Sequence, residues 1–150
     1  MIDWQWCALH ELPARRLYAL FAARQKVFVV EQACAYLDLD GLDDDAEHLI
    51  AWSGEDIAAY LRLLAPGTAF AEPSLGRVLT MSAFRGSGLG RELMLKGLAR
   101  AYERYPGHLV RIGAQAYLQK FYSSLGFTIA SEPYLEDGIP HLEMLHNPRL

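Results

Sequence analysis

The fold is decided by Gly76-Arg77-Val78-Leu79-Thr80-Met81, which leads into Arg85-Gly86-Ser87-Gly88-Leu89-Gly90 and then Arg91-Glu92-Leu93-Met94-Leu95-Lys96-Gly97-Leu98. The first segment is typical of a strand, the second of a tight turn and the third of an amphipathic helix. The first N–H groups of a helix have no partner inside the helix and lie at the positive end of its dipole. Glycines at this junction let an anion approach the main chain, so the order of elements predicts a site for a phosphorylated ligand.

The spacing of the glycines distinguishes three kinds of phosphate-binding loop. A P-loop requires Lys and Ser or Thr after its last glycine, whereas Arg91-Glu92 follows Gly90 here. A dinucleotide-binding loop has the spacing GxGxxG, whereas Gly86, Gly88 and Gly90 have the spacing GxGxG. The third kind, Arg-x-x-Gly-x-Gly, binds the pyrophosphate of coenzyme A. Arg85, Gly88 and Gly90 match that third pattern.

The size and composition of the chain predict a single domain spanning residues 1–150. Its 150 residues are 52% hydrophobic and 21% charged, as in an ordinary globular domain. The net charge of −4, without a basic cluster, argues against a nucleic-acid partner. We find neither the pattern of a signal peptide nor an apolar run of membrane-spanning length, so we expect a cytoplasmic protein with no membrane partner. Cys7 and Cys34 form no CxxC pair, and we expect free thiols and no bound metal.

Apolar periodicity and turn residues predict a mixed α/β domain with the glycine loop at a strand-to-helix junction. The helix that begins near Pro13 is expected to stop within residues 27–31, and Gly126 is expected in a left-handed helix cap. The expected elements are strand 2–7, the helix from Pro13, an acidic loop 36–47, hairpin strands 48–53 and 57–64, strand 76–81, helix 90–105, strand 109–113, helix 116–124, and strands 127–130 and 140–145.

Further motifs accompany the glycine loop along nearly the whole chain. They are Arg24 with Val27-Phe28-Val29-Val30-Glu31-Gln32, Asp38-Leu39-Asp40-Gly41, Gly113-Ala114-Gln115-Ala116, Phe121-Tyr122-Ser123-Ser124-Leu125-Gly126-Phe127 and Glu136-Asp137-Gly138-Ile139-Pro140-His141. Together with the loop they resemble the GNAT acyltransferase superfamily, and more closely its ElaA-type branch. The resemblance implies the GNAT fold: a mostly antiparallel, mixed central sheet that splays at the strand before the loop, flanked by about four helices.

The resemblance also implies an N-acetyltransferase that takes acetyl-CoA as co-substrate and transfers the acetyl group to an amine by direct attack in a ternary complex. Tyr122 falls on the position of the general acid that protonates the departing thiolate. A tyrosine hydroxyl, with an ordinary pKa of about 10, is protonated at neutral pH and can serve this role. Gln115 stands where many family members have asparagine, and it can still donate and accept hydrogen bonds. The implied acetyl-CoA-binding residues are Val78, Leu79, Thr80, Arg85, Gly86, Ser87, Gly88, Leu89, Gly90, Arg91, Gln115 and Phe121.

The acceptor side requires a proton acceptor, because a primary amine is protonated at neutral pH. Glu31 and His141 are the candidates. The alternative for Glu31 is an ion pair with Arg24, and the alternative for His141 is a structural role in a late strand. His48 opens an apolar strand, and we expect it to cap that strand rather than to act as the base.

The acidic loop carries Asp38, Asp40, Asp43, Asp44 and Asp45. Counted from Asp38, glycine falls fourth and Leu49 twelfth, so the spacing does not fit a calcium-binding EF-hand. We expect a solvated turn. The alternative is that Asp38 and Asp40 line the acceptor mouth and attract cationic amines.

Two other functions use the same fold. One is a sensor or scaffold that binds acyl-CoA without turnover. The other follows from the segment Arg24…Val27-Phe28, which also resembles acyl-homoserine-lactone synthases, although this chain is short for that class. The expected partner is an amine on a small molecule or a peptide, and the sequence fits either a monomer or a homodimer.

Overall fold

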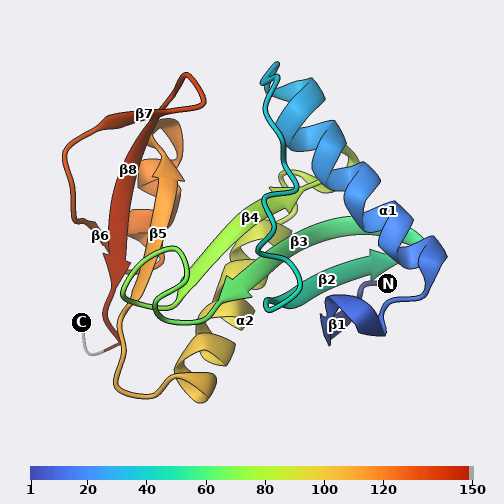
Figure 1. Ribbon diagram of the computed structural model, residues 1–150, viewed down its shortest axis with the longest axis horizontal. Coiled ribbons are helices and arrows are strands. Elements are labelled where there is room, and N and C mark those ends of the chain that lie inside the picture. Colours follow the sequence, from blue (N-terminus) through green and yellow to red (C-terminus); the bar gives the residue numbers. More distant parts are fainter. Residues whose placement is uncertain (149–150) are drawn as a thin grey trace.

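The computed structural model describes residues 1–148 as one curved sheet with helices on both faces (Figure 1). The strands are β1 (Asp3–Ala8), β2 (Glu47–Ser53), β3 (Asp56–Leu64), β4 (Ser74–Thr80), β5 (Val110–Gln115), β6 (Phe127–Ile129), β7 (Tyr134–Glu136) and β8 (Ile139–His146). The α-helices are α1 (Ala14–Gln25), α2 (Leu89–Arg104) and α3 (Gln119–Ser124). The remaining helical segments are the π-helix η2 (Lys26–Glu31) and the 3₁₀ turns η1 (Leu9–Glu11), η3 (Ser82–Phe84) and η4 (Ala116–Leu118).

The sheet separates into two halves at its middle. The strand order is β1-β2-β3-β4-β5-β8-β6, with β7 paired to β8. Neighbouring strands are antiparallel except β4 and β5, which run parallel and share the single registered pair Ser74–Arg111. Beyond that pair the two strands diverge, and Figure 1 shows the gap that widens between them.

The alternation of side chains along β2 explains how both faces of the sheet are covered. Ile50 and Trp52 belong to the apolar cluster beneath α1, whereas Leu49 and Ala51 belong to the larger cluster under α2 and α3. Successive residues of a strand point to opposite faces, so one apolar run supplies both layers. α1 and α2 thereby cover the two faces of β1–β4, and the glycine loop connects β4 to α2.

The elements predicted from the sequence are largely confirmed. The hairpin at residues 47–64, the strand before the glycine loop and the helix after it are present, and Gly126 has the expected left-handed conformation with φ of 99°. The first helical segment ends at Glu31, within the expected range, although its last part is a π-helix. The strand β7 was not predicted, and the described residues contain three α-helices rather than about four. Residues 1–148 contain no helix that is long and apolar enough to cross a membrane.

Candidate active site

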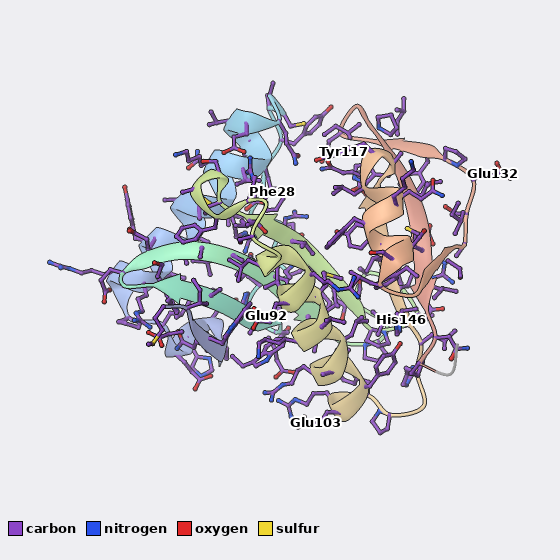
Figure 2. The ribbon with its side chains drawn as sticks, turned by 180° about the vertical axis from the view of Figure 1, so that it is seen from behind. Phe28, Glu92, Glu103, Tyr117, Glu132 and His146 are labelled. Carbon is purple, nitrogen blue, oxygen red and sulfur yellow. The ribbon has the colours of Figure 1, made fainter. Side chains whose placement is uncertain are left out.

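A cavity of about 810 Å³ lies between the two halves of the sheet. One wall is made by η2, β4 and the glycine loop, and the other by β5, α3 and the β7–β8 turn. Phe28 and Tyr117 both line the cavity, and Figure 2 shows them on opposite sides of the gap between the halves. The splay of the sheet therefore creates the space that a ligand would enter.

A bulge in β4 shapes one wall of this cavity. Tyr60 pairs with Leu79 but Arg62 pairs with Gly76, so β4 contains one residue more than β3 over this stretch. Arg77 within the bulge has φ of 51°, a conformation that is uncommon outside glycine. From residue 76 to Thr80 the edge of β4 that faces β5 runs along the cavity, without registered partners among the described residues. Such an edge offers main-chain N–H and C=O groups to an extended ligand.

The glycine loop lies at the start of α2 and is open enough to receive an anion. Gly86 and Gly88 both have φ of 82°, and a Cβ atom added at either would meet nothing within 4 Å. The N–H of Glu92 donates to the carbonyl of Gly88 at 3.2 Å, so the main-chain amides that precede Glu92 in the first turn have no partner within the helix. These amides and the helix dipole favour negative charge at this position. The loop therefore fits a pyrophosphate.

Two arginines lie beside the loop. The Arg85 guanidinium donates through Nε to the carbonyl of Thr80 at 2.8 Å and through Nη2 to the Glu31 carboxylate at 2.7 Å. Arg91 donates through Nη1 to the hydroxyl of Ser124 at 3.5 Å. The alternative that Glu31 forms an ion pair with a nearby arginine such as Arg24 is therefore right about the ion pair but not about the partner, which is Arg85.

Tyr122 lies on α3, at the other wall of the cavity. Its ring packs edge-on against Phe121 and Phe127, with centroid separations of 5.1 and 5.7 Å. Burial, with a smaller contribution from Tyr117, raises the pKa of Tyr122 to about 12. The hydroxyl is thus held protonated at neutral pH, which is the state that a general acid requires.

His141 lies on β8 opposite Gln115 of β5, and its side chain is largely buried. Its Nδ1 lies 2.7 Å from the carbonyl of Ile139. A carbonyl only accepts hydrogen bonds, so Nδ1 carries the proton and the neutral ring has its lone pair on Nε2. The Glu136 carboxylate lies 3.5 Å from Nε2, and the Tyr134 ring stacks on the imidazole at 5.9 Å. Both proton-acceptor candidates, Glu31 and His141, line the cavity.

The acidic loop is not the solvated turn that the sequence suggested. The side chains of Asp38 and Asp43 are only 7% and 9% exposed, and both bind the fully buried Arg24, at 2.8 and 2.6 Å. Arg62 joins Asp43 at 3.1 Å and Asp40 at 2.5 Å.

The same ion-pair network limits the alternative interpretation of the loop. Asp38 does line the cavity, but Asp40 is not among the residues that line it. The Arg77 guanidinium forms ion pairs with the carboxylates of Asp38 at 2.7 Å and Asp40 at 3.3 Å. The charges that were expected to attract amines are therefore balanced by arginines of this chain.

His48 is a buried structural residue away from the cavity. Its Nε2 donates to the carbonyl of Asp43 at 2.9 Å, and its Nδ1 accepts from the hydroxyl of Tyr60 at 2.5 Å. The expectation that it caps its strand is therefore wrong, since its partners come from the acidic loop and from β3.

The structure brings the predicted site residues together with one exception. Ser87 does not line the cavity, and its hydroxyl donates to the carbonyl of Phe84 at 2.7 Å. Sequence reasoning missed Arg77 and Tyr117, because neither residue type nor spacing distinguishes them; Phe28 belonged to a shared motif that could have indicated it. The predicted residues that line the cavity are Glu31, Val78, Leu79, Thr80, Arg85, Gly86, Gly88, Leu89, Gly90, Arg91, Gln115, Phe121, Tyr122 and His141.

Known proteins resemble this chain over most of its length. Residues 20–147 match the family described as an acetyltransferase (GNAT) domain. The chain is 43% identical to protein ElaA of Escherichia coli strain K12 over 146 residues, which cover 96% of this chain and 95% of ElaA.

Solved structures show the same likeness. An acyl-CoA N-acyltransferase from Pseudomonas aeruginosa superposes with a TM-score of 0.91 at 43% identity, covering 98% of this chain and 100% of that one. Escherichia coli ElaA superposes with a TM-score of 0.91 at 42% identity, covering 98% and 100% of the two chains. A CoA-dependent acyl-homoserine lactone synthase shares the fold, with a TM-score of 0.78 at 16% identity and coverage of 97% and 82%.

Proposed function

This chain belongs to the GNAT acetyltransferase family, and on that premise we propose that it transfers an acetyl group from acetyl-CoA to an amine on a small molecule or a peptide. The observation that carries the proposal is that three features line the same cavity. These are the open edge of β4, the amide-rich start of α2 and the protonated hydroxyl of Tyr122. Each suits a different part of an acyl-CoA molecule.

The donor half of the cavity is supported by the shape of the main chain. The β4 edge at residues 78–80 would hold the pantetheine arm as an additional strand holds its neighbour, through N–H and C=O groups. The loop amides and Arg85 would hold the pyrophosphate. Gln115 and Phe121 line the cavity on the side of β5 and α3, where they would contact the same arm.

The acceptor would enter between η2 and the β7–β8 turn, and His141 is the better-placed base. Its proton lies on Nδ1, so the Nε2 lone pair can take a proton, with the Glu136 carboxylate 3.5 Å away. The imidazole takes a proton from the ammonium group, and the amine nitrogen then forms a bond to the thioester carbonyl carbon. When the C–S bond breaks, Tyr122 donates its proton to the thiolate, and the nitrogen of the new amide loses its second proton, which returns Tyr122 to its neutral state. Direct attack in a ternary complex needs no covalent enzyme intermediate.

Replacement of Tyr122 by phenylalanine tests this function. We expect kcat for CoA release from acetyl-CoA with a pooled panel of amines to fall by about 10²-fold or more, which is the usual contribution of a positioned acid. The affinity for acetyl-CoA should stay within about twofold, since the ring is kept. Tyr18→Phe is the matched control, because Tyr18 is 79% exposed and lies outside the cavity.

The outcomes separate the enzyme from the binding-protein alternative. Turnover undiminished in Tyr122→Phe contradicts the assignment of Tyr122 as the acid. Tight binding of acetyl-CoA by the unmodified protein, with no turnover on any amine, favours a sensor or scaffold of the same fold.

A further inference from the structure

We infer that the ion pair between Arg85 and Glu31 is a switch, in which donor binding at Arg85 releases the Glu31 carboxylate to bind the ammonium group of the acceptor. The inference rests on the proposed function, because it takes Arg85 as a ligand of the pyrophosphate. It names the contact that would couple the two halves of the cavity.

The two residues connect the two halves of the cavity. Glu31 ends the π-helix η2 on the acceptor side, and Arg85 begins the glycine loop on the donor side, 54 residues later in the chain. Their side chains are 29% and 47% exposed, so the pair is accessible to an entering ligand. The Arg85 guanidinium is also fixed at Nε by the carbonyl of Thr80, which keeps it at the mouth of the loop.

A pyrophosphate and Glu31 would bind the same guanidinium. Thr80 accepts from the Nε–H and Glu31 from one Nη2–H, so a pyrophosphate would take the remaining N–H groups of Nη1 and Nη2, which brings its charge close to the Glu31 carboxylate. The pyrophosphate carries more negative charge than a carboxylate and also receives the loop amides, so it is the stronger ligand. Its charge also repels the Glu31 carboxylate from this position.

Once released, Glu31 finds no substitute cation among the arginines that line the cavity. Arg77 is held by Asp38 and Asp40, and Arg91 donates to the hydroxyl of Ser124. The released carboxylate lines the same cavity as His141 and would be satisfied by a protonated amine. Glu31 thereby positions the ammonium group, and His141 takes its proton.

Coupling between two sites is reciprocal, so the same contact that the donor must break opposes donor binding. Removal of the Glu31 charge should therefore tighten CoA. The pair is partly exposed, so we expect a modest effect, about two- to fivefold. The effect should be confined to ligands that carry the pyrophosphate, and it should require Arg85.

A double-mutant cycle measured by calorimetry tests the switch. The dissociation constants of CoA and of pantetheine, which lacks the pyrophosphate, are measured for the unmodified protein, Glu31→Gln, Arg85→Gln and the double variant. We expect Glu31→Gln to tighten CoA two- to fivefold, to leave pantetheine unchanged and to have no effect in the Arg85→Gln background. Asp137→Asn is the matched control. It removes a negative charge from the same cavity at a left-handed position that asparagine tolerates, and it should leave CoA affinity unchanged.

Three results would overturn the switch: unchanged or weaker CoA binding in Glu31→Gln, equal tightening in the Arg85→Gln background, or equal tightening in Asp137→Asn. The last two would mean that the cavity responds to total charge and not to the ion pair. Thermal unfolding of each variant, followed by circular dichroism, confirms that it is folded. If the unmodified protein binds no CoA at all, the proposed function is refuted together with the switch. If it binds CoA but the double-mutant cycle gives no coupling between Glu31 and Arg85, only the switch is refuted.

Discussion

Replacement of Asp43 by asparagine should destabilise the protein far more than the same change at its neighbour. The Asp43 carboxylate receives Arg24 Nη1 at 2.6 Å and Arg62 Nη1 at 3.1 Å, and its side chain is only 9% exposed. Asparagine keeps the shape and the main-chain carbonyl that accepts from His48, but it removes the charge between two buried cations.

The expected magnitude follows from burial and from the partners that remain. Breaking a buried ion pair by removing one partner costs about 3–5 kcal/mol. Arg24 keeps Asp38 and Arg62 keeps Asp40, so we expect the lower end, about 3 kcal/mol. For a chain of this size that loss lowers Tm by roughly 6–12 °C. Urea denaturation at pH 7 measures the free energy of unfolding. Asp44→Asn is the control, since Asp44 is exposed and should cost at most about 0.5 kcal/mol.

The pH dependence of the same pair of proteins provides a second test. Burial alone would raise the pKa of Asp43, but the hydrogen bonds and charges of Arg24 and Arg62 outweigh burial and lower it. A carboxyl whose folded pKa lies below its unfolded value of about 3.9 stabilises the fold fully above about pH 5. That stabilisation is lost as the pH falls through 4 toward the folded pKa. The gap between the unmodified protein and Asp43→Asn should therefore narrow in acid. A cost below about 1 kcal/mol at pH 7, or a gap that stays constant down to pH 3, would refute this account.

Three further predictions concern single residues. Gly88→Glu places a side chain at φ of 82° and a negative charge in the anion-binding loop, so acetyl-CoA affinity measured by calorimetry should fall at least about tenfold; unchanged affinity would mean that the loop does not bind the donor. Gly126→Ala should lower the free energy of unfolding, measured by urea denaturation, by about 1–3 kcal/mol, because φ is 99° and the new Cβ would lie 3.0 Å from His146 Nε2. Gly107→Ala is the control and should lower it less, since φ is 84° but the space around the residue is open. Burial lowers the pKa of His48, so as the pH falls the unfolded chain takes up this proton before the folded protein does. The free energy of unfolding should therefore fall below about pH 6.5, by up to about 1.4 kcal/mol per pH unit. His48→Gln should flatten this slope between pH 5 and 6.5, and an unchanged slope would exclude His48 as its source.

Local patterns were sufficient wherever one segment carried all the necessary information. The strand, glycine loop and helix at 76–98 are adjacent in the chain, and their geometry follows from glycine conformations and helix termini. The same holds for Tyr122 and Gly126, which are four residues apart on α3 and its cap. No long-range contact is needed to recognise either feature.

The sequence did not reveal which charged residues pair with one another. Arg24 is 7 residues from Glu31 but pairs with Asp38 and Asp43, while Glu31 pairs with Arg85. These choices depend on the π-helical turns of η2, which rotate Glu31 away from Arg24, and such turns have no distinct residue pattern. The bulge that turns Arg77 toward the acidic loop is equally invisible in the sequence, because it is a difference in register between two strands.

By itself, therefore, the sequence determined the family, the order of the elements and the glycine loop, because each of these is written in residues that are close along the chain. Tertiary structure alone decided the splay between β4 and β5, the partners of Glu31 and the burial of the aspartates. The physical reason is how far apart in the sequence the interacting residues are. Backbone conformation follows mainly from neighbouring residues, whereas an ion pair or a cavity depends on where distant segments come to lie.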